Sequence, residues 1–150
     1  MSDNQIKIAL KEATISSMKK GEKEATTTLR MFSAEIKKEE IEKKAELTDE
    51  ETISIVQKMI KQRKDSFSQF EQAGRDELAE KEAREISILE KFLPEQLSEE
   101  EILQEVNQAI AESGAESMQD MGKVMGLLKN KLSGKADMGL VSIKVKESLG

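Results

Sequence analysis

The sequence predicts an all-α protein in two parts, an N-terminal helical domain of about four helices and a small C-terminal domain of three helices. Start and stop signals for helices recur along the whole chain. Apolar residues recur at the three-to-four-residue spacing of helices, and no segment alternates as a strand does. Only four of the 150 residues are aromatic, all Phe, whereas 37% are apolar and 36% charged. That composition is typical of charged helices around modest aliphatic cores.

The first two helices are predicted from glycine punctuation and apolar spacing. The first spans residues 6–20 and ends at Gly21. The second runs from about residue 22 to 44, with Leu29 and Phe32 on one face. Because these apolar residues share a face, we expect that face to pack into a core.

The third and fourth helices are expected to form a hairpin. Thr48 and Glu51 make a capping box, so the third helix begins there and continues to about Gln72. The fourth spans residues 76–92 and must end before Pro94, since proline restricts the residue before it and cannot continue a helix.

Pro94 is the only proline, and we interpret it as a domain boundary. The predicted organisation is an N-terminal domain over residues 1–93, a linker over 94–98 and a C-terminal domain over 99–150. The three helices of the C-terminal domain are expected to begin at a capping box of Ser98 and Glu101, at Ser117 with Asp120, and at Asp137.

Composition excludes several functions. The chain has no cysteine and no histidine. Thiolate chemistry, disulfides, the usual general base and the commonest metal ligand are therefore missing, and we expect neither an enzyme nor a cofactor or metal. No stretch approaches the roughly 18–20 apolar residues of a membrane span, and the N-terminus lacks a basic-then-apolar signal segment. A cytoplasmic protein is expected.

Charge is segregated along the chain, although the total is only −6. Residues 1–90 carry 17 basic and 20 acidic side chains, a net −3. Residues 91–120 carry one basic and eight acidic, a net −7, and residues 121–150 carry six basic and two acidic, a net +4. The C-terminal end is therefore the part most suited to an anionic partner.

The stretch MGKVMGLLKNKLSGKADMG, residues 121–139, combines glycine and lysine in one predicted helix. Each helical glycine costs about 1 kcal/mol relative to Ala, so Gly122 and Gly126 need an explanation. Either they let another helix pack closely, or they let a nucleic-acid backbone approach while lysines neutralise its phosphates. The candidate RNA-binding residues are Gly122, Lys123, Gly126, Lys129, Lys131 and Lys135.

Two features of the predicted third helix also carry charge. Arg63 lies within its apolar stripe and, in an antiparallel hairpin, falls near Glu85 with Glu82 one turn away. We interpret it as an ion pair partly covered by helix packing, with an arginine exposed for phosphate as the alternative. The lysines at 58, 61 and 64 are interpreted as a solvated face, and runs of acids at helix starts as surface groups rather than an active site.

Several segments resemble the YqeY-like proteins. They are LRMFSAEIKKEEI, ELTDEE, KQRKDSFSQFEQAGRDELAEKEAREISILEKFLPEQLSEEEI and GKVMG…SGKAD…LV, and they occur in the order and spacing of that family. The family is similar to the helical tail of the B subunit of glutamyl-tRNA(Gln)/aspartyl-tRNA(Asn) amidotransferase. The resemblance implies a two-part helical fold and a noncatalytic role in holding tRNA.

Two short elements resemble the amidotransferase tail in particular. Gly122, Val124 and Met125 match a Gly-x-Val-Met element, and residues 134–137 match a Gly-Lys/Arg-Ala-Asn/Asp element. Met138 departs from the pattern, because Gly or Pro is usual there. Proline at a first helical position is preorganised for the helix and Met is not, so the helix start is expected to persist with altered detail.

The leading hypothesis is therefore a noncatalytic, translation-associated accessory protein that binds tRNA through phosphate-backbone contacts. A second hypothesis is a helical interaction adaptor, in which the acidic residues 95–120 and the basic end contact an aminoacylation or amidotransferase enzyme without touching RNA. An amidase activity of its own is disfavoured, because the resemblance includes no catalytic module.

Overall fold

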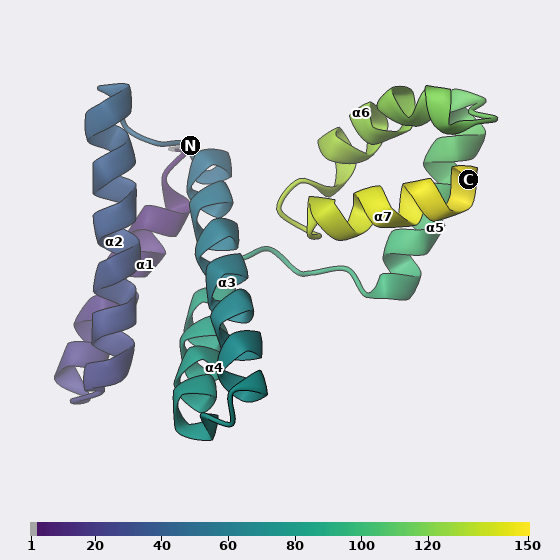
Figure 1. The fold of residues 1–150 in the computed structure, drawn as a ribbon. Coiled ribbons are helices and arrows are strands. Elements are labelled where there is room, and N and C mark those ends of the chain that lie inside the picture. Colours follow the sequence, from purple (N-terminus) through teal and green to yellow (C-terminus); the bar gives the residue numbers. More distant parts are fainter. Residues whose placement is uncertain (1–2) are drawn as a thin grey trace. The chain divides into compact units, whose positions relative to one another are not determined.

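The computed structural model describes residues 3–150, and over these residues it is all-α without strands, which confirms the predicted class (Figure 1). The expected absence of an N-terminal signal falls partly on residues 1–2, which lie outside this range. The described chain divides into two compact units, the first ending at Leu93 and the second beginning at Pro94.

The first unit contains four helices in two hairpins. They are α1 (Gln5–Lys19), α2 (Lys23–Lys43), α3 (Asp49–Gln72) and α4 (Asp76–Glu90). The α1–α2 turn passes through Gly21 and the α3–α4 turn through Gly74, each with φ of +71°, which glycine adopts without steric cost. Between the hairpins, α2 ends at Lys44, a non-glycine residue in the left-handed region with φ of +59°.

The core of the first unit is built from all four helices. Leu10, Phe32, Val56 and Leu89 are at most 3% exposed and belong to one apolar cluster. Phe92, just after α4, meets Phe32 edge-on with ring centroids 5.5 Å apart. Burying these aliphatic and aromatic groups is the main stabilising contribution to this unit.

The second unit is a three-helix domain with a short 3₁₀ turn. Its elements are α5 (Glu99–Ser113), η1 (Met118–Asp120), α6 (Met121–Leu132) and α7 (Met138–Leu149). Val106, Val124, Leu128 and Val141, all 0% exposed, form its core. Ser117 and Asp120 were expected to begin the second helix of this domain. They instead begin and end the 3₁₀ turn segment, and α6 begins at the next residue, Met121.

The start of the second unit is fastened to the turn between α6 and α7. Leu97 N–H donates to the Lys135 carbonyl at 2.9 Å, and Gln96 Nε2 donates to the Gly134 carbonyl at 2.7 Å. Residues 96 and 97 of the expected linker are thus structured parts of this unit.

Both predicted capping boxes are present. Thr48 Oγ1 accepts from Glu51 N–H while Glu51 Oε1 accepts from Thr48 N–H, and Ser98 and Glu101 repeat the exchange. These contacts satisfy backbone donors that a helix start leaves unpaired.

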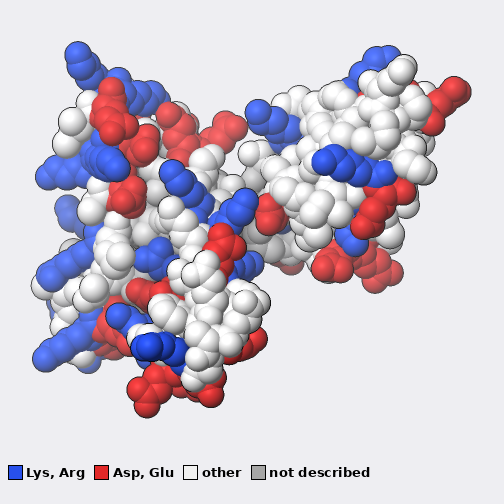
Figure 2. All heavy atoms as spheres, viewed as in Figure 1, with Lys and Arg blue, Asp and Glu red and all other residues white. Residues whose placement is uncertain are grey.

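On the surface, acidic and basic side chains are mixed over the visible face of each unit (Figure 2).

Candidate functional site

The glycines of α6 lie on its open face. Val124, Leu128 and Leu132 are at most 2% exposed and point into the core of the unit, whereas Gly122 and Gly126 are exposed. A Cβ added to either glycine would meet no atom within 4 Å. Close helix packing therefore does not explain these glycines in the described structure, and their surface is open to a partner.

Lysines border the open glycine face. At about 100° per residue, Gly122, Gly126 and Lys129 fall in one row along α6, and Lys123 lies about a quarter-turn from it. Lys123 and Lys129 are exposed and take part in no ion pair among residues 3–150. We call Gly122, Lys123, Gly126 and Lys129 the α6 face.

The other two candidate lysines lie elsewhere. Lys131 falls on the side of α6 away from the glycine row, and its Nζ pairs with Glu105 of α5 at 2.9 Å. That hydrogen bond raises the pKa of Lys131. Lys135 lies beyond the end of α6 with its side chain exposed and its carbonyl engaged by Leu97. Of the six predicted RNA-binding residues, four therefore lie on the α6 face, and Lys131 and Lys135 do not.

The Gly-Lys-Ala-Asp element is a turn with distinct local roles. Gly134 is buried with φ of +80°, and Ala136 is 3% exposed within the core cluster. Asp137 Oδ1 accepts from Gly139 N–H at 2.9 Å and caps α7. Since α7 begins at Met138, the helix start persists despite the departure at this position. Only Lys135 presents its side chain to solvent here.

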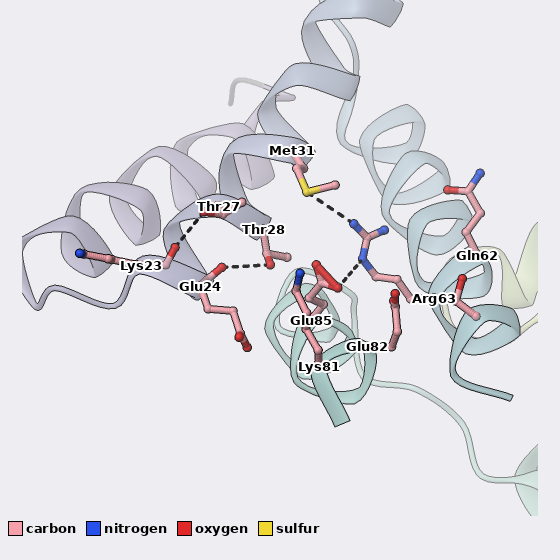
Figure 3. A pocket seen from close by; sticks show the side chains of 11 residues that line it. Lys23, Glu24, Thr27, Thr28, Met31, Gln62, Arg63, Lys81, Glu82 and Glu85 are labelled. Carbon is pink, nitrogen blue, oxygen red and sulfur yellow. Dashed lines mark hydrogen bonds and ion pairs between the residues drawn. The ribbon is translucent and has the colours of Figure 1, made fainter. Parts of the chain in front are cut away.

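The structure also places Arg63 in a pocket of the first unit, between α2, α3 and α4 (Figure 3). Arg63 is 9% exposed, and its Nε lies 3.8 Å from Glu85 Oε2. Its Nη1 donates to the Met59 carbonyl at 3.2 Å, while Nε has no hydrogen-bond partner. The predicted covered ion pair is confirmed, and the alternative of an arginine exposed for phosphate is wrong.

Charges in this pocket of about 600 Å³ are balanced. Its lining carries three cations, Lys23, Lys81 and Arg63, and three acids, Glu24, Glu82 and Glu85. Arg63 pairs with Glu85, whereas Glu24 pairs with Arg84. Burial raises the pKa of Glu82, the neighbouring Glu85 carboxylate raises it further, and Arg63 and Lys81 oppose the shift. We interpret Arg63 and Glu85 as a structural ion pair, because both residues are buried and Arg63 is engaged by Glu85 and by the Met59 carbonyl.

Other candidate groups are surface features. Lys58, Lys61 and Lys64 are exposed and pair with no acid within the described chain. Residues 3–150 contain no group of His, Cys, Asp and Glu suited to hold a metal ion. Within the same range, no helix is both long and apolar enough to cross a bilayer.

Comparison with known proteins gives matches over nearly the whole chain. The family model described as Yqey-like protein matches residues 7–149. An uncharacterised protein of Schizosaccharomyces pombe is 36% identical over 93 residues, which are 62% of this chain and 76% of that protein. The protein of Pyrenophora tritici-repentis named altered inheritance of mitochondria protein 41, mitochondrial, is 33% identical over 136 residues, 89% of this chain and 75% of that one. A protein of the same name from Clavispora lusitaniae is 38% identical over 92 residues, 60% and 50% of the two chains.

Proposed function

The chain belongs to the Yqey-like protein family, and from this premise we propose that it is a noncatalytic accessory protein that associates with tRNA through the α6 face. The observation that carries the proposal is an exposed pair of helical glycines flanked by two unpaired lysines. Bare backbone permits a sugar-phosphate chain to come close, and Lys123 and Lys129 supply the charge that such contacts use.

Contacts of this kind position an RNA without reading its bases. The chain contains no Trp, Tyr or His on which bases could stack, and its four Phe all lie in the first unit, none of them among its exposed large apolar residues. We therefore expect modest, salt-sensitive affinity for the shape and backbone of a folded RNA. The names of two relatives place those fungal proteins in mitochondria, whereas we expect this chain in the cytoplasm, and tRNA occurs in both compartments.

A fluorescence-anisotropy titration of labelled tRNA between about 50 and 200 mM salt tests the proposal. Lys123→Glu/Lys129→Glu should weaken binding and lower the slope of log K against log salt concentration by about two. The control is Lys91→Glu/Lys146→Glu, which changes net charge equally at exposed lysines that belong to neither α6 nor its glycine row. Absence of binding at low salt, or equal loss in both double variants, would refute a specific role for the α6 face.

The interaction adaptor remains the second candidate, and the acidity of α5 favours it. Its first turn is Glu99, Glu100 and Glu101, all exposed. Recovery of an aminoacylation enzyme from RNase-treated lysate, with recovery lost on reversing the charges of Glu99 and Glu100, would support the adaptor over tRNA association. Those two residues are chosen because Glu101 also caps the helix.

A further inference from the structure

The outward face of α2 carries a regular row of cations. Lys23, Arg30 and Lys37 are seven residues apart, and Lys44 follows at the same interval where the helix ends. All four are exposed. Seven residues are nearly two helical turns, so the cations lie along one side of the helix about 10.5 Å apart. We call these four residues the α2 row.

The α2 row has almost no acids within reach on its own helix. Residues three and four away along a helix are its surface neighbours, and for this row they are Thr, Ser, Ala, Ile and Lys, with the exception of Glu40. Glu40 is already engaged, because its Oε2 accepts from Lys7 Nζ and from the Leu47 N–H.

Other cations of the first unit form ion pairs, in contrast to the α2 row. Lys7, Lys43 and Arg84 each pair with a glutamate within 2.7 Å, whereas no member of the α2 row forms an ion pair among residues 3–150. Blue spheres occur along the left edge of the first unit in the view, where α1 and α2 both lie, with red spheres among them toward the top (Figure 2). Residues 22–44 carry six basic and six acidic side chains, so the α2 row is a line of unpaired cations on a segment without net charge.

Short or apolar side chains separate the cations. Thr27, Ala34 and Ile41 occupy the intervening positions of the row. A hollow of about 370 Å³ is lined by Ala34, Lys37, Lys38, Ile41 and Glu42. Ile41 is 67% exposed, the highest value among the large apolar side chains exposed in residues 3–150. The surface thus combines spaced charge with one apolar contact.

We propose that the α2 row is a second RNA-binding surface, which takes the phosphate backbone of a structured RNA. Phosphate contacts need spaced cations and room for close approach, and the row offers both. A helical protein partner would instead need a continuous apolar seam, and Thr27 and the cations of the row interrupt it. The choice of RNA as the polyanion rests on the proposed function, but the surface lies wholly in the first unit and does not depend on the α6 face.

Charge reversal in the full-length chain tests the inference. Arg30→Glu/Lys37→Glu should weaken binding of labelled tRNA and lower the salt slope by about two, and the Lys91→Glu/Lys146→Glu control should not. Combining it with Lys123→Glu/Lys129→Glu should add the two losses, since the two pairs belong to different units and share no partner. Arg30→Gln/Lys37→Gln should give about half the loss, and equal thermal unfolding of all variants by circular dichroism shows that the fold is intact.

These variants test the α2 row and the α6 face separately. Loss on changing only the α2 row would support the inference while refuting the α6 face, and loss on changing only the α6 face would overturn the inference. Amine acetylation read by mass spectrometry gives a second measurement on the unaltered chain. Bound tRNA should protect Lys23, Lys37 and Lys44 but leave Lys91 reactive. Equal reactivity with and without tRNA at the α2 row would overturn the proposal, as would binding unchanged by Arg30→Glu/Lys37→Glu.

Discussion

Replacing Gly126 with alanine should stabilise the protein while weakening its association with tRNA. Gly126 lies in the middle of α6 with ordinary helical backbone geometry, and a Cβ there meets nothing within 4 Å. No steric penalty then opposes the intrinsic preference of Ala over Gly in a helix, which is about 0.8–1 kcal/mol. For a domain of this size, about 1 kcal/mol corresponds to a rise in Tm of about 4–8 °C.

The assay is thermal and urea unfolding followed by circular dichroism, because the chain has neither Trp nor Tyr to report by fluorescence. Calorimetry should assign the shift to the transition of the second unit. Gly114→Ala is the matched control, since a Cβ there also meets nothing within 4 Å but φ is +69°. That variant should lose about 1 kcal/mol, because alanine is strained in the left-handed region.

A destabilised Gly126→Ala variant would refute the reasoning, since it would mean that another part of the protein packs on the α6 face. Stabilisation with unchanged tRNA affinity would agree with an exposed Gly126. It would refute the idea that this glycine lets an RNA backbone approach closely. Opposite signs in the two measurements, a higher Tm and a lower affinity, are the expected result.

Further predictions concern the ion pairs and one strained cap. Glu85→Gln should lower the free energy of unfolding by about 1–3 kcal/mol, because it leaves the buried Arg63 without its carboxylate, and an unchanged Tm would contradict the pair. The pKa of Glu82 is raised by burial, so its ionisation opposes folding above the ordinary value of 4.5. Glu82→Gln should therefore stabilise the protein at neutral pH, with the gain vanishing in urea titrations below that pH. Lys7 and the Leu47 N–H lower the pKa of Glu40, so Glu40→Gln should be destabilising at neutral pH, and this loss should disappear as pH falls below 4.5. Lys44→Gly should raise the free energy of unfolding by about 0.5–1 kcal/mol, measured by urea unfolding, because glycine relieves the left-handed conformation at φ of +59°.

Most helix starts and ends could be predicted from the sequence, because capping residues, glycine and proline act on the backbone within a few residues. The capping boxes at Thr48 and Ser98 mark the starts of α3 and α5 where the structure has them. The 3₁₀ turn before α6 was not foreseen, since Ser117 and Asp120 satisfy the same donors in a tight turn as in an α-helix.

Tertiary placement was harder to predict. Arg63 and Glu85 could be paired in advance because a hairpin turn fixes the register of its two helices. Helical spacing separates Lys131 from Lys129, but the pairing of Lys131 with Glu105 could not be predicted, because it depends on where α5 packs. The α2 row, by contrast, was present in the sequence as a seven-residue spacing of Lys and Arg, and the structure supplied only its exposure and its lack of partners.

The hydrogen bonds of Gln96 and Leu97 to the α6–α7 turn bear on how the second unit can be studied by itself. A fragment beginning at Ser98 would keep the capping box of α5 but leave the carbonyls of Gly134 and Lys135 without two donors. Each lost partner costs about 1–3 kcal/mol where the acceptor stays buried. A C-terminal fragment for NMR should therefore begin no later than Glu95, although the first helix starts four residues further on.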